Sequence, residues 1–218
     1  MAITREQTTG KFRISASTPA QGTFGTNPTE GELIVVGFWG YSGPNFQPQD
    51  CTDNQGNRYS LAAVSAAATR TLAVWWTIAG PSSGPFQVSI TSAVAGAFSG
   101  AGCATSFSTD GTGLWRPDER VSATGNSTTP ATGNTGTLDE AGELVIAMVG
   151  SITVDQPSIA VESVSPSWTV EAEELSWLTY LPGEMNSRIV SSTTAQSCSW
   201  TLGTSASWGC LVCTFKDA

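Results

Sequence analysis

The sequence contains no histidine and few positively charged residues. Its 218 residues include 9 Lys plus Arg and 18 Asp plus Glu, for a net charge of −9. Without His, neither Ser-His-Asp nor Cys-His catalysis is available, and no imidazole can bind a metal. Nucleic-acid binding needs Lys and Arg to neutralise phosphates, and this chain has few of either. We therefore expect neither a histidine-dependent enzyme nor a nucleic-acid-binding protein.

Long apolar runs are also absent. No run of about 18 apolar residues occurs, so we expect no transmembrane helix and no membrane partner. The first residues, MAITRE, lead into polar sequence without the apolar segment of a secretory signal, which predicts synthesis in a cytoplasm. Hydrophobic residues still make up 39% of the chain, enough for a folded core.

The remaining pattern is typical of an all-β protein. Short β-branched and aromatic stretches alternate with clusters of Gly, Pro, Asn and Ser. LIVVGFW at 33–39 and LVIAMV at 144–149 are apolar on both faces, which predicts strands covered from both sides. The expected strands cover residues 11–17, 32–39, 58–64, 71–78, 86–91, 101–107, 143–149, 158–163, 168–173, 177–181, 187–192, 197–202 and 208–215.

An internal repeat runs through the chain. TPAQG at 18–22 recurs as TPATG at 129–133, and GEL at 31–33 recurs at 142–144. Weaker matches follow in the same order: RYSL with SWTV, SIT with SWT, and Gly102-Cys103…Phe107 with Gly209-Cys210…Phe215. The preserved order predicts a duplication with repeats over 14–110 and 125–218.

The repeat sets the expected domain organisation. A sheet with one apolar face must be covered, which favours two repeats packed around one shared core over two separate small sandwiches. The Gly-, Ser- and Thr-rich stretch at 122–136 is the expected connection, and the charged segment at 116–120 belongs to neither repeat. Residues 1–13 are expected to form an N-terminal arm.

Charge is distributed unevenly. Residues 139–184 carry carboxylates and no Lys or Arg, whereas the arm carries Arg5, Lys11 and Arg13 against Glu6. A basic arm beside an acidic body could dock on a neighbouring copy. The alternative is a solvated arm and carboxylates that keep the protein soluble.

Few residues suggest a metal site or catalysis. DNQGN at 53–57, with Asp50, offers the oxygen ligands Asp50, Asp53 and Asn57 for calcium, but the pattern favours a plain turn. Glu171 and Glu173 would share one face of a strand as an acid–base pair, although an exposed strand is the favoured interpretation. Glu32 and Glu143 occupy matched repeat positions, which indicates a structural role. We expect no catalytic residue, no metal and no cofactor.

The five cysteines are expected to be buried free thiols. Cys210 and Cys213 should point to opposite faces of one strand and therefore share no metal or bond. Cys103 and Cys210 occupy matched positions of the repeat, which favours a packing role.

Eight tryptophans are many for this length, and core packing accounts for most of them. Trp75 and Trp76 are adjacent, so they must point to opposite faces of their strand. Trp76 is therefore a candidate for an exposed or interface position.

The repeated pattern resembles the duplicated jelly-roll β-sandwich domains, of the lectin-like kind, of tailed-phage virion proteins and bacterial surface proteins. The resemblance rests on the GEL turn into an apolar strand, DNQGNRYS at 53–60, IAG at 78–80 and QVSIT at 87–91. It implies an all-β, antiparallel jelly-roll β-sandwich built from two related halves.

The same resemblance implies a non-enzymatic structural protein of the virion, either a capsid decoration protein or a tail or fibre component. Its partners would be other virion proteins and copies of itself. The candidate partner-binding residues are Arg5, Lys11, Arg13 and Trp76. Deleting residues 1–13 should then abolish attachment and leave the fold intact. A carbohydrate-binding module or adhesin with a glycan partner is the alternative function, and a glycoside hydrolase is the third.

Overall fold

The computed structural model describes residues 2–14, 20–42, 48–67, 70–92, 98–151, 161–174 and 182–217, which form strands joined by turns and loops. None of these segments is a helix of the length and apolarity that a membrane span requires. The described part of the first half contains β1 (Ile3–Ile14), β2 (Ala20–Thr23), β3 (Leu33–Ser42), β4 (Pro48–Asp53), β5 (Ser60–Ala67), β6 (Arg70–Ile78), β7 (Gln87–Ser92) and β8 (Phe98–Thr109). The described part of the second half contains β9 (Trp115–Ser127), β10 (Glu143–Ser151), β11 (Val161–Val164), β12 (Thr169–Glu174), β13 (Gly183–Val190), β14 (Trp200–Leu202) and β15 (Ala206–Asp217).

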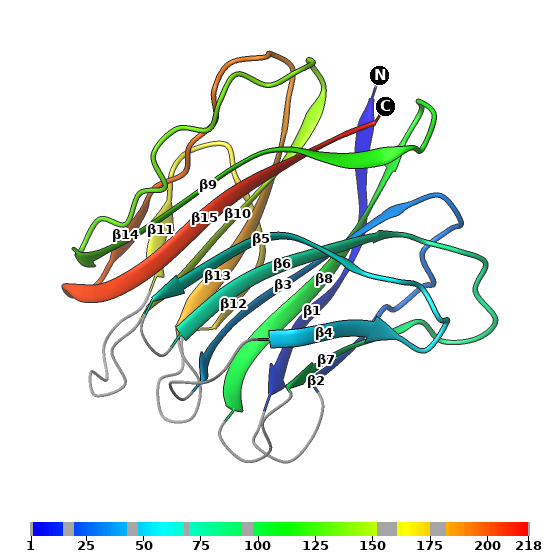
Figure 1. Cartoon of the computed structure of the whole chain (residues 1–218), viewed down its shortest axis with the longest axis horizontal. Coiled ribbons are helices and arrows are strands. Elements are labelled where there is room, and N and C mark those ends of the chain that lie inside the picture. The colour runs from blue at the N-terminus through cyan, green and yellow to red at the C-terminus, as the bar shows by residue number, and fades with distance from the viewer. Residues whose placement is uncertain are drawn as a thin grey trace.

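The strands form antiparallel sheets stacked in four layers (Figure 1). Inner sheet 1 has the order β1-β8-β3-β6-β5, and inner sheet 2 has the order β12-β13-β10-β15-β9. Outer sheet 1 (β2-β7-β4) covers the first inner sheet, and outer sheet 2 (β11-β14) covers the second. The inner sheets pack face to face, with β1 against β12 at one edge and β5 against β9 and β15 at the other. The molecule is thus an all-β, sandwich-like stack.

Three hydrophobic cores separate the four layers. The central core lies between the inner sheets and contains Leu33, Val35, Leu144 and Ile146. The first outer core contains Ile34 and Val36 with Val88 and Ile90 of β7, and the second contains Val145 and Ala147 with Trp200 of β14. The expectation of one shared core was therefore too simple. Alternate side chains of β3 and β10 enter different cores, as expected for strands covered from both sides.

The two inner sheets share the same pairing pattern. Leu33 of β3 lies between Ile78 and Phe107, and Leu144 of β10 lies between Ile189 and Phe215. The GEL segments that precede these leucines both place glycine, Gly31 and Gly142, at a φ of 90°. Cys103, however, lies in the central core and Cys210 in the second outer core. The prediction that Cys103 and Cys210 match is wrong. Cys103 lies four residues before Phe107, the partner of Leu33, whereas the residue four before Phe215, the partner of Leu144, is Leu211.

Two parts of the predicted domain organisation need correction. The expected arm at 1–13 is largely strand β1, which pairs with β8 from Ile3 to Ile14. The expected connection at 122–136 begins inside β9, a strand that also contains the charged segment 116–120 and pairs with β15. Both are edge strands with many exposed polar side chains, so their sequences lack the apolar signal used to predict strands. The strand expected at 177–181 lies outside the described residues.

Candidate functional site

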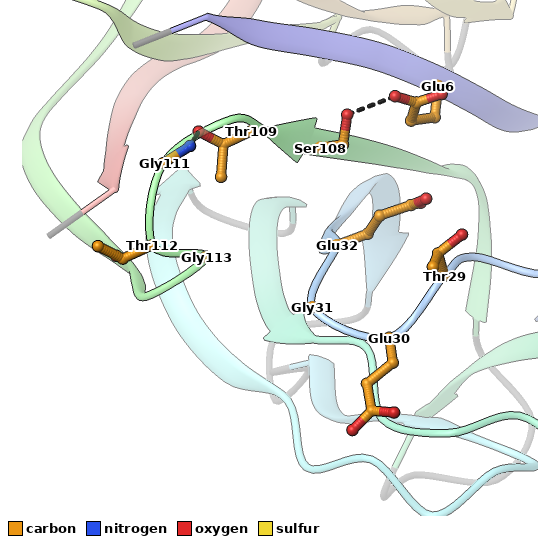
Figure 2. A pocket seen from close by; sticks show the side chains of 10 residues that line it. All are labelled: Glu6, Thr29, Glu30, Gly31, Glu32, Ser108, Thr109, Gly111, Thr112 and Gly113. Carbon is orange, nitrogen blue, oxygen red and sulfur yellow. Dashed lines mark hydrogen bonds between the residues drawn. The ribbon is translucent and has the colours of Figure 1, made fainter.

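An open pocket lies at one end of the first half, between two loops (Figure 2). One loop, residues 29–32, leads into β3, and the other, residues 109–113, follows β8. The pocket has a volume of about 480 Å³. Its lining residues are Glu6, Thr29, Glu30, Gly31, Glu32, Ser108, Thr109, Gly111, Thr112 and Gly113.

Glu32 forms the innermost acidic group of the pocket. The residue is 8% exposed, and its Oε2 atom has no hydrogen-bond partner among the described residues. Figure 2 shows its carboxylate pointing into the space between Glu6 and Thr29. Removing a carboxylate oxygen from water without a partner is costly, so this oxygen is well placed to accept a hydrogen bond from a ligand.

The backbone fixes the position of Glu32. Gly31 adopts the left-handed conformation that glycine tolerates, and its N–H donates to the carbonyl of Ala79 at 2.9 Å. The Glu32 N–H donates to the Thr29 carbonyl at 3.0 Å, and the Ala79 N–H donates to the Glu32 carbonyl at 2.8 Å. The GEL segment therefore holds Glu32 at the start of a central strand.

The opposite wall is held by hydroxyl groups. The Ser108 hydroxyl donates to the carboxylate of Glu6, and the Thr109 hydroxyl accepts from the Gly111 N–H at 3.0 Å. Thr112 donates to Asp217 near the C-terminus of β15. The wall is thus built by β1, β8 and the following loop, and it presents oxygen atoms to the pocket.

The pocket is strongly acidic. Its described lining residues include three carboxylates and neither Lys nor Arg. The described part of the chain contains no group of three His, Cys, Asp or Glu side chains that could hold a metal ion. Carboxylate and hydroxyl oxygens that line one pocket suit a ligand that donates several hydrogen bonds and carries positive charge.

The three cations predicted to bind a partner are instead engaged within the chain. The Nε–H of Arg5 in β1 donates to both carboxylate oxygens of Glu171 in β12, at 2.9 and 2.8 Å. Arg13 Nε lies 2.7 Å from Glu174 Oε2, and Lys11 Nζ lies 3.3 Å from the same oxygen. These contacts, called the ionic seam below, join the facing edges of the two inner sheets.

The ionic seam compensates buried charge. The side chain of Glu171 is fully buried and that of Glu174 is 1% exposed. Glu171 also accepts hydrogen bonds from Thr105 and Ser187. The hydrogen bond to Glu171 raises the pKa of the Arg5 guanidinium, against the opposing effect of burial. The complementary charges that suggested docking on another copy therefore meet in the same molecule.

The acid–base pair considered for Glu171 and Glu173 is not formed. A β-bulge between Val170 and Ala172 shifts the register of β12. Glu171 and Glu174 are consequently buried, whereas Glu173 is exposed. In a regular strand, side chains alternate between the two faces, which would place Glu171 and Glu173 on the same face. The bulge interrupts this alternation.

The calcium candidates form a turn. Asp53 Oδ1 accepts from the N–H groups of Gln55 and Asn57 at 2.9 and 3.1 Å, and Oδ2 accepts from the Asn57 amide at 2.8 Å. Asn57 Oδ1 accepts from the Gly80 N–H. Asp50 is exposed on β4. The ligand oxygens of Asp53 and Asn57 are thus used by the Asx-type turn that the sequence favoured.

Trp76 lies between the two halves. It is half-buried against the central core, and its ring centroid lies 6.1 Å from that of Phe215 in inner sheet 2. Trp75 belongs to the first outer core, so the prediction that these neighbours point to opposite faces is confirmed. Trp177 lies outside the described residues.

The prediction of buried free thiols is confirmed. All five are free and buried, and Cys210 and Cys213 enter different cores. Burial raises the pKa of Cys213 to about 12 and that of Cys103 to about 11. Such thiols are protonated at neutral pH and poor nucleophiles.

Sequence reasoning missed the acidic pocket. It noted Glu32 but interpreted it as structural, and it gave no role to Glu6, Glu30 or Ser108. These residues come from three segments, and nothing in their spacing indicates that they meet. The matched GEL segments were the available signal, because they marked Glu32 as a fixed acidic position.

The comparisons with known proteins give no relative. No family model, no curated protein and no solved structure matches the chain.

Proposed function

We propose that the chain is a duplicated jelly-roll β-sandwich. The pairs β1–β8, β2–β7 and β3–β6 are nested in the first half, as expected when a long hairpin is rolled into a jelly roll. The strand β5 departs from the simplest form, because it pairs with β6 at the edge of the inner sheet. The nested pairing supports two Greek keys in the first half.

The second half repeats this arrangement. Its inner sheet, read from β9, has the order β9-β15-β10-β13-β12, which corresponds to β1-β8-β3-β6-β5. The β-bulge between Leu61 and Ala63 in β5 has its counterpart between Val170 and Ala172 in β12. Bulges depend on local sequence and pairing, so a shared bulge supports a common origin of the halves.

The proposed function is that of a non-enzymatic structural protein of a tailed-phage virion, a capsid decoration protein or a tail or fibre component. The observation that carries this proposal is the nested strand pairing repeated in both halves. Several groups that could perform chemistry serve the fold: Glu171 and Glu174 join the inner sheets, and the five thiols fill cores. Such a rigid body acts through its surface, by binding neighbouring subunits.

Two surfaces are available for such binding. One is the acidic pocket. The other is the edge where β5 faces β9, with a pocket of about 370 Å³ lined by Ala63, Val64 and Arg120 among others. Leu61 and Val64 are 52% and 44% exposed on β5, which ends its sheet. An exposed strand edge with apolar side chains favours contact with another chain, including a copy of this protein.

Mass spectrometry of gradient-purified phage particles tests the proposed function. The particles come from a lysate of cells that carry the gene, and the soluble fraction of that lysate is the control. We expect the protein to be present in the particle fraction at a fixed ratio to the major capsid protein. A protein found only in the soluble fraction would contradict a virion role.

The carbohydrate-binding alternative requires an aromatic platform on the surface. Trp168 is a half-buried candidate, but the Arg188 guanidinium covers its ring at 4.6 Å from the centroid. A glycan array separates the two functions: specific hits would favour the adhesin, and their absence would favour the structural protein.

A further inference from the structure

The proposed duplication provides an internal comparison for the acidic pocket. Leu33 and Leu144 pair with Phe107 and Phe215, so the next residues, Ser108 and Lys216, correspond. Arg5 and Pro117 pair with the same two phenylalanines, so the residues that follow, Glu6 and Asp118, correspond as well. Each residue of the pocket near Glu6 can therefore be compared with its counterpart in the second half.

A lysine side chain occupies the counterpart position. Lys216 Nζ lies 2.7 Å from Asp118 Oδ1 and also contacts Asp139. In the first half, Ser108 donates to Glu6 in the same way that Lys216 donates to Asp118. The serine hydroxyl is shorter than a lysine side chain and carries no charge. The acidic pocket is therefore the position that an ammonium group fills in the other half.

Two acidic positions correspond, Glu6 with Asp118 and Glu32 with Glu143, whereas Asp139 has Pro28 at its counterpart position. Glu32 and Glu143 are both buried at the start of a central strand, and Oε2 of each has no partner among the described residues. In the second half, the hydrogen bonds from Lys216 and Asp139 outweigh the effect of burial and hold the pKa of Asp118 below its usual value. The hydrogen bonds that Lys216 makes with Asp118 and Asp139 raise its own pKa. The ammonium group thus compensates Asp118 and Asp139, and the acidic residues that line the first-half pocket have no such lysine.

We propose that the acidic pocket of the first half binds the ammonium group of a lysine side chain from a partner protein. This inference rests on the proposed duplication and gives a chemical identity to the contact in the proposed structural function. The three N–H donors of an ammonium group match the carboxylates of Glu6 and Glu32 and the nearby hydroxyl groups. Glu30, exposed at the rim, adds attraction for an approaching cation.

The lysine comes from a different protein. The sequence contains two lysines, Lys11 and Lys216, and both form ion pairs within the chain. A second copy in the same conformation would have to break one of these pairs to supply the ammonium group. A surface lysine of a different subunit has no such cost.

A titration followed by ¹⁵N–¹H NMR tests the proposal on the whole protein. The probe is Nα-acetyl-lysine-N-methylamide, and the control ligand is its neutral Nε-acetylated form. We expect the amine to shift the amide signals of residues 29–32 and 108–113, and the neutral form to bind about tenfold more weakly or worse. Equal binding of both ligands, or the absence of shifts at these residues, would overturn the proposal.

Two substitutions of Ser108 provide matched variants. Ser108→Lys should place an ammonium group in the pocket, abolish the titration and raise Tm above that of Ser108→Met, which has a similar length and no charge. A Ser108→Met protein as stable as Ser108→Lys would contradict the proposal.

Glu32→Gln removes the charge of Glu32 and changes its size very little. It should weaken amine binding about tenfold while the circular dichroism spectrum stays unchanged. These experiments use the isolated protein, so they are independent of the test for virion incorporation. The protein can be found in virions although the pocket binds no amine, and the pocket can bind an amine although the protein is absent from virions.

Discussion

Arg5 and Glu171 are 166 residues apart in the sequence, and Nη2 of Arg5 lies 2.8 Å from Oε2 of Glu171. This pair joins the first strand of inner sheet 1 to the edge strand of inner sheet 2. The basic residues near the start of the sequence thus contact the acidic residues of the second half. Because one partner is fully buried, the pair has a measurable effect on stability.

Arg5→Ala should destabilise the protein by about 2–3 kcal/mol, because it leaves the buried Glu171 carboxylate without its cation. Chemical unfolding measures this loss, and Arg58→Ala, which changes an exposed arginine, is the matched control. The double variant Arg5→Ala/Glu171→Gln should lose less than the sum of the two single variants. An Arg5→Ala protein within about 0.5 kcal/mol of the wild type would show that the seam has no stabilising role.

Deletion of residues 1–13 should destabilise the fold and promote aggregation. Nearly all of β1 would be lost, the edge of β8 would become unpaired, and Glu171 and Glu174 would lose the cations of the ionic seam. This reverses the expectation from sequence that the truncated protein stays folded. Thermal unfolding and size-exclusion chromatography measure the effect, and a truncated monomer with unchanged Tm would contradict it.

Stability should fall as the pH rises from about 4.5 to about 7. Burial raises the pKa of Glu184 from its ordinary 4.5 to about 7, and burial does the same for Glu143. A carboxyl group with a raised pKa in the folded state stays protonated there while the unfolded chain ionises, so its contribution to stability is fully present below about pH 4.5 and is lost through this interval.

Glu184→Gln isolates one of these contributions. The variant should match the wild type near pH 4.5 and be more stable by about 3 kcal/mol at pH 8, since glutamine stays neutral. Urea unfolding at several pH values provides the measurement. Parallel pH profiles for the two proteins would refute the assignment to Glu184.

The five thiols should be unreactive in the folded protein. All are buried, and burial raises their pKa values, to about 12 for Cys198 and Cys210. Ellman's reagent should label essentially none of them under native conditions and all five in denaturant without a reductant. Rapid native labelling would show an accessible cysteine, and fewer than five after denaturation would show a disulfide.

The sequence predicted the central strands well because burial on both faces leaves a continuous apolar run. Residues 144–149 lie within β10, which is buried along its whole length. Edge strands carry no such signal. The end of β9, residues 122–127, consists of Ser, Ala, Thr, Gly and Asn and alternates exposed with half-buried side chains, so it was predicted to belong to the connection.

Long-range placement was harder to predict. The basic residues near the N-terminus and the acidic region at 139–184 were recognised as complementary, but their contact within one chain depends on how the sheets stack. Similarly, the bulge at Glu171 depends on the pairing of β12 with β13, which local alternation does not encode. The acidic pocket joins Glu6, Glu32 and Ser108 through sheet pairing, so sequence spacing could not reveal it.

Binding of the purified protein to phage particles tests the account most directly. Particles lacking the protein are mixed with the wild type or with Ser108→Lys, separated by density-gradient sedimentation and imaged by negative-stain electron microscopy. The account predicts that the wild type sediments with the particles and that folded Ser108→Lys stays in the soluble fraction. Wild-type protein that remains soluble at every concentration would contradict the proposed structural role, and equal binding of both proteins would contradict the role of the acidic pocket.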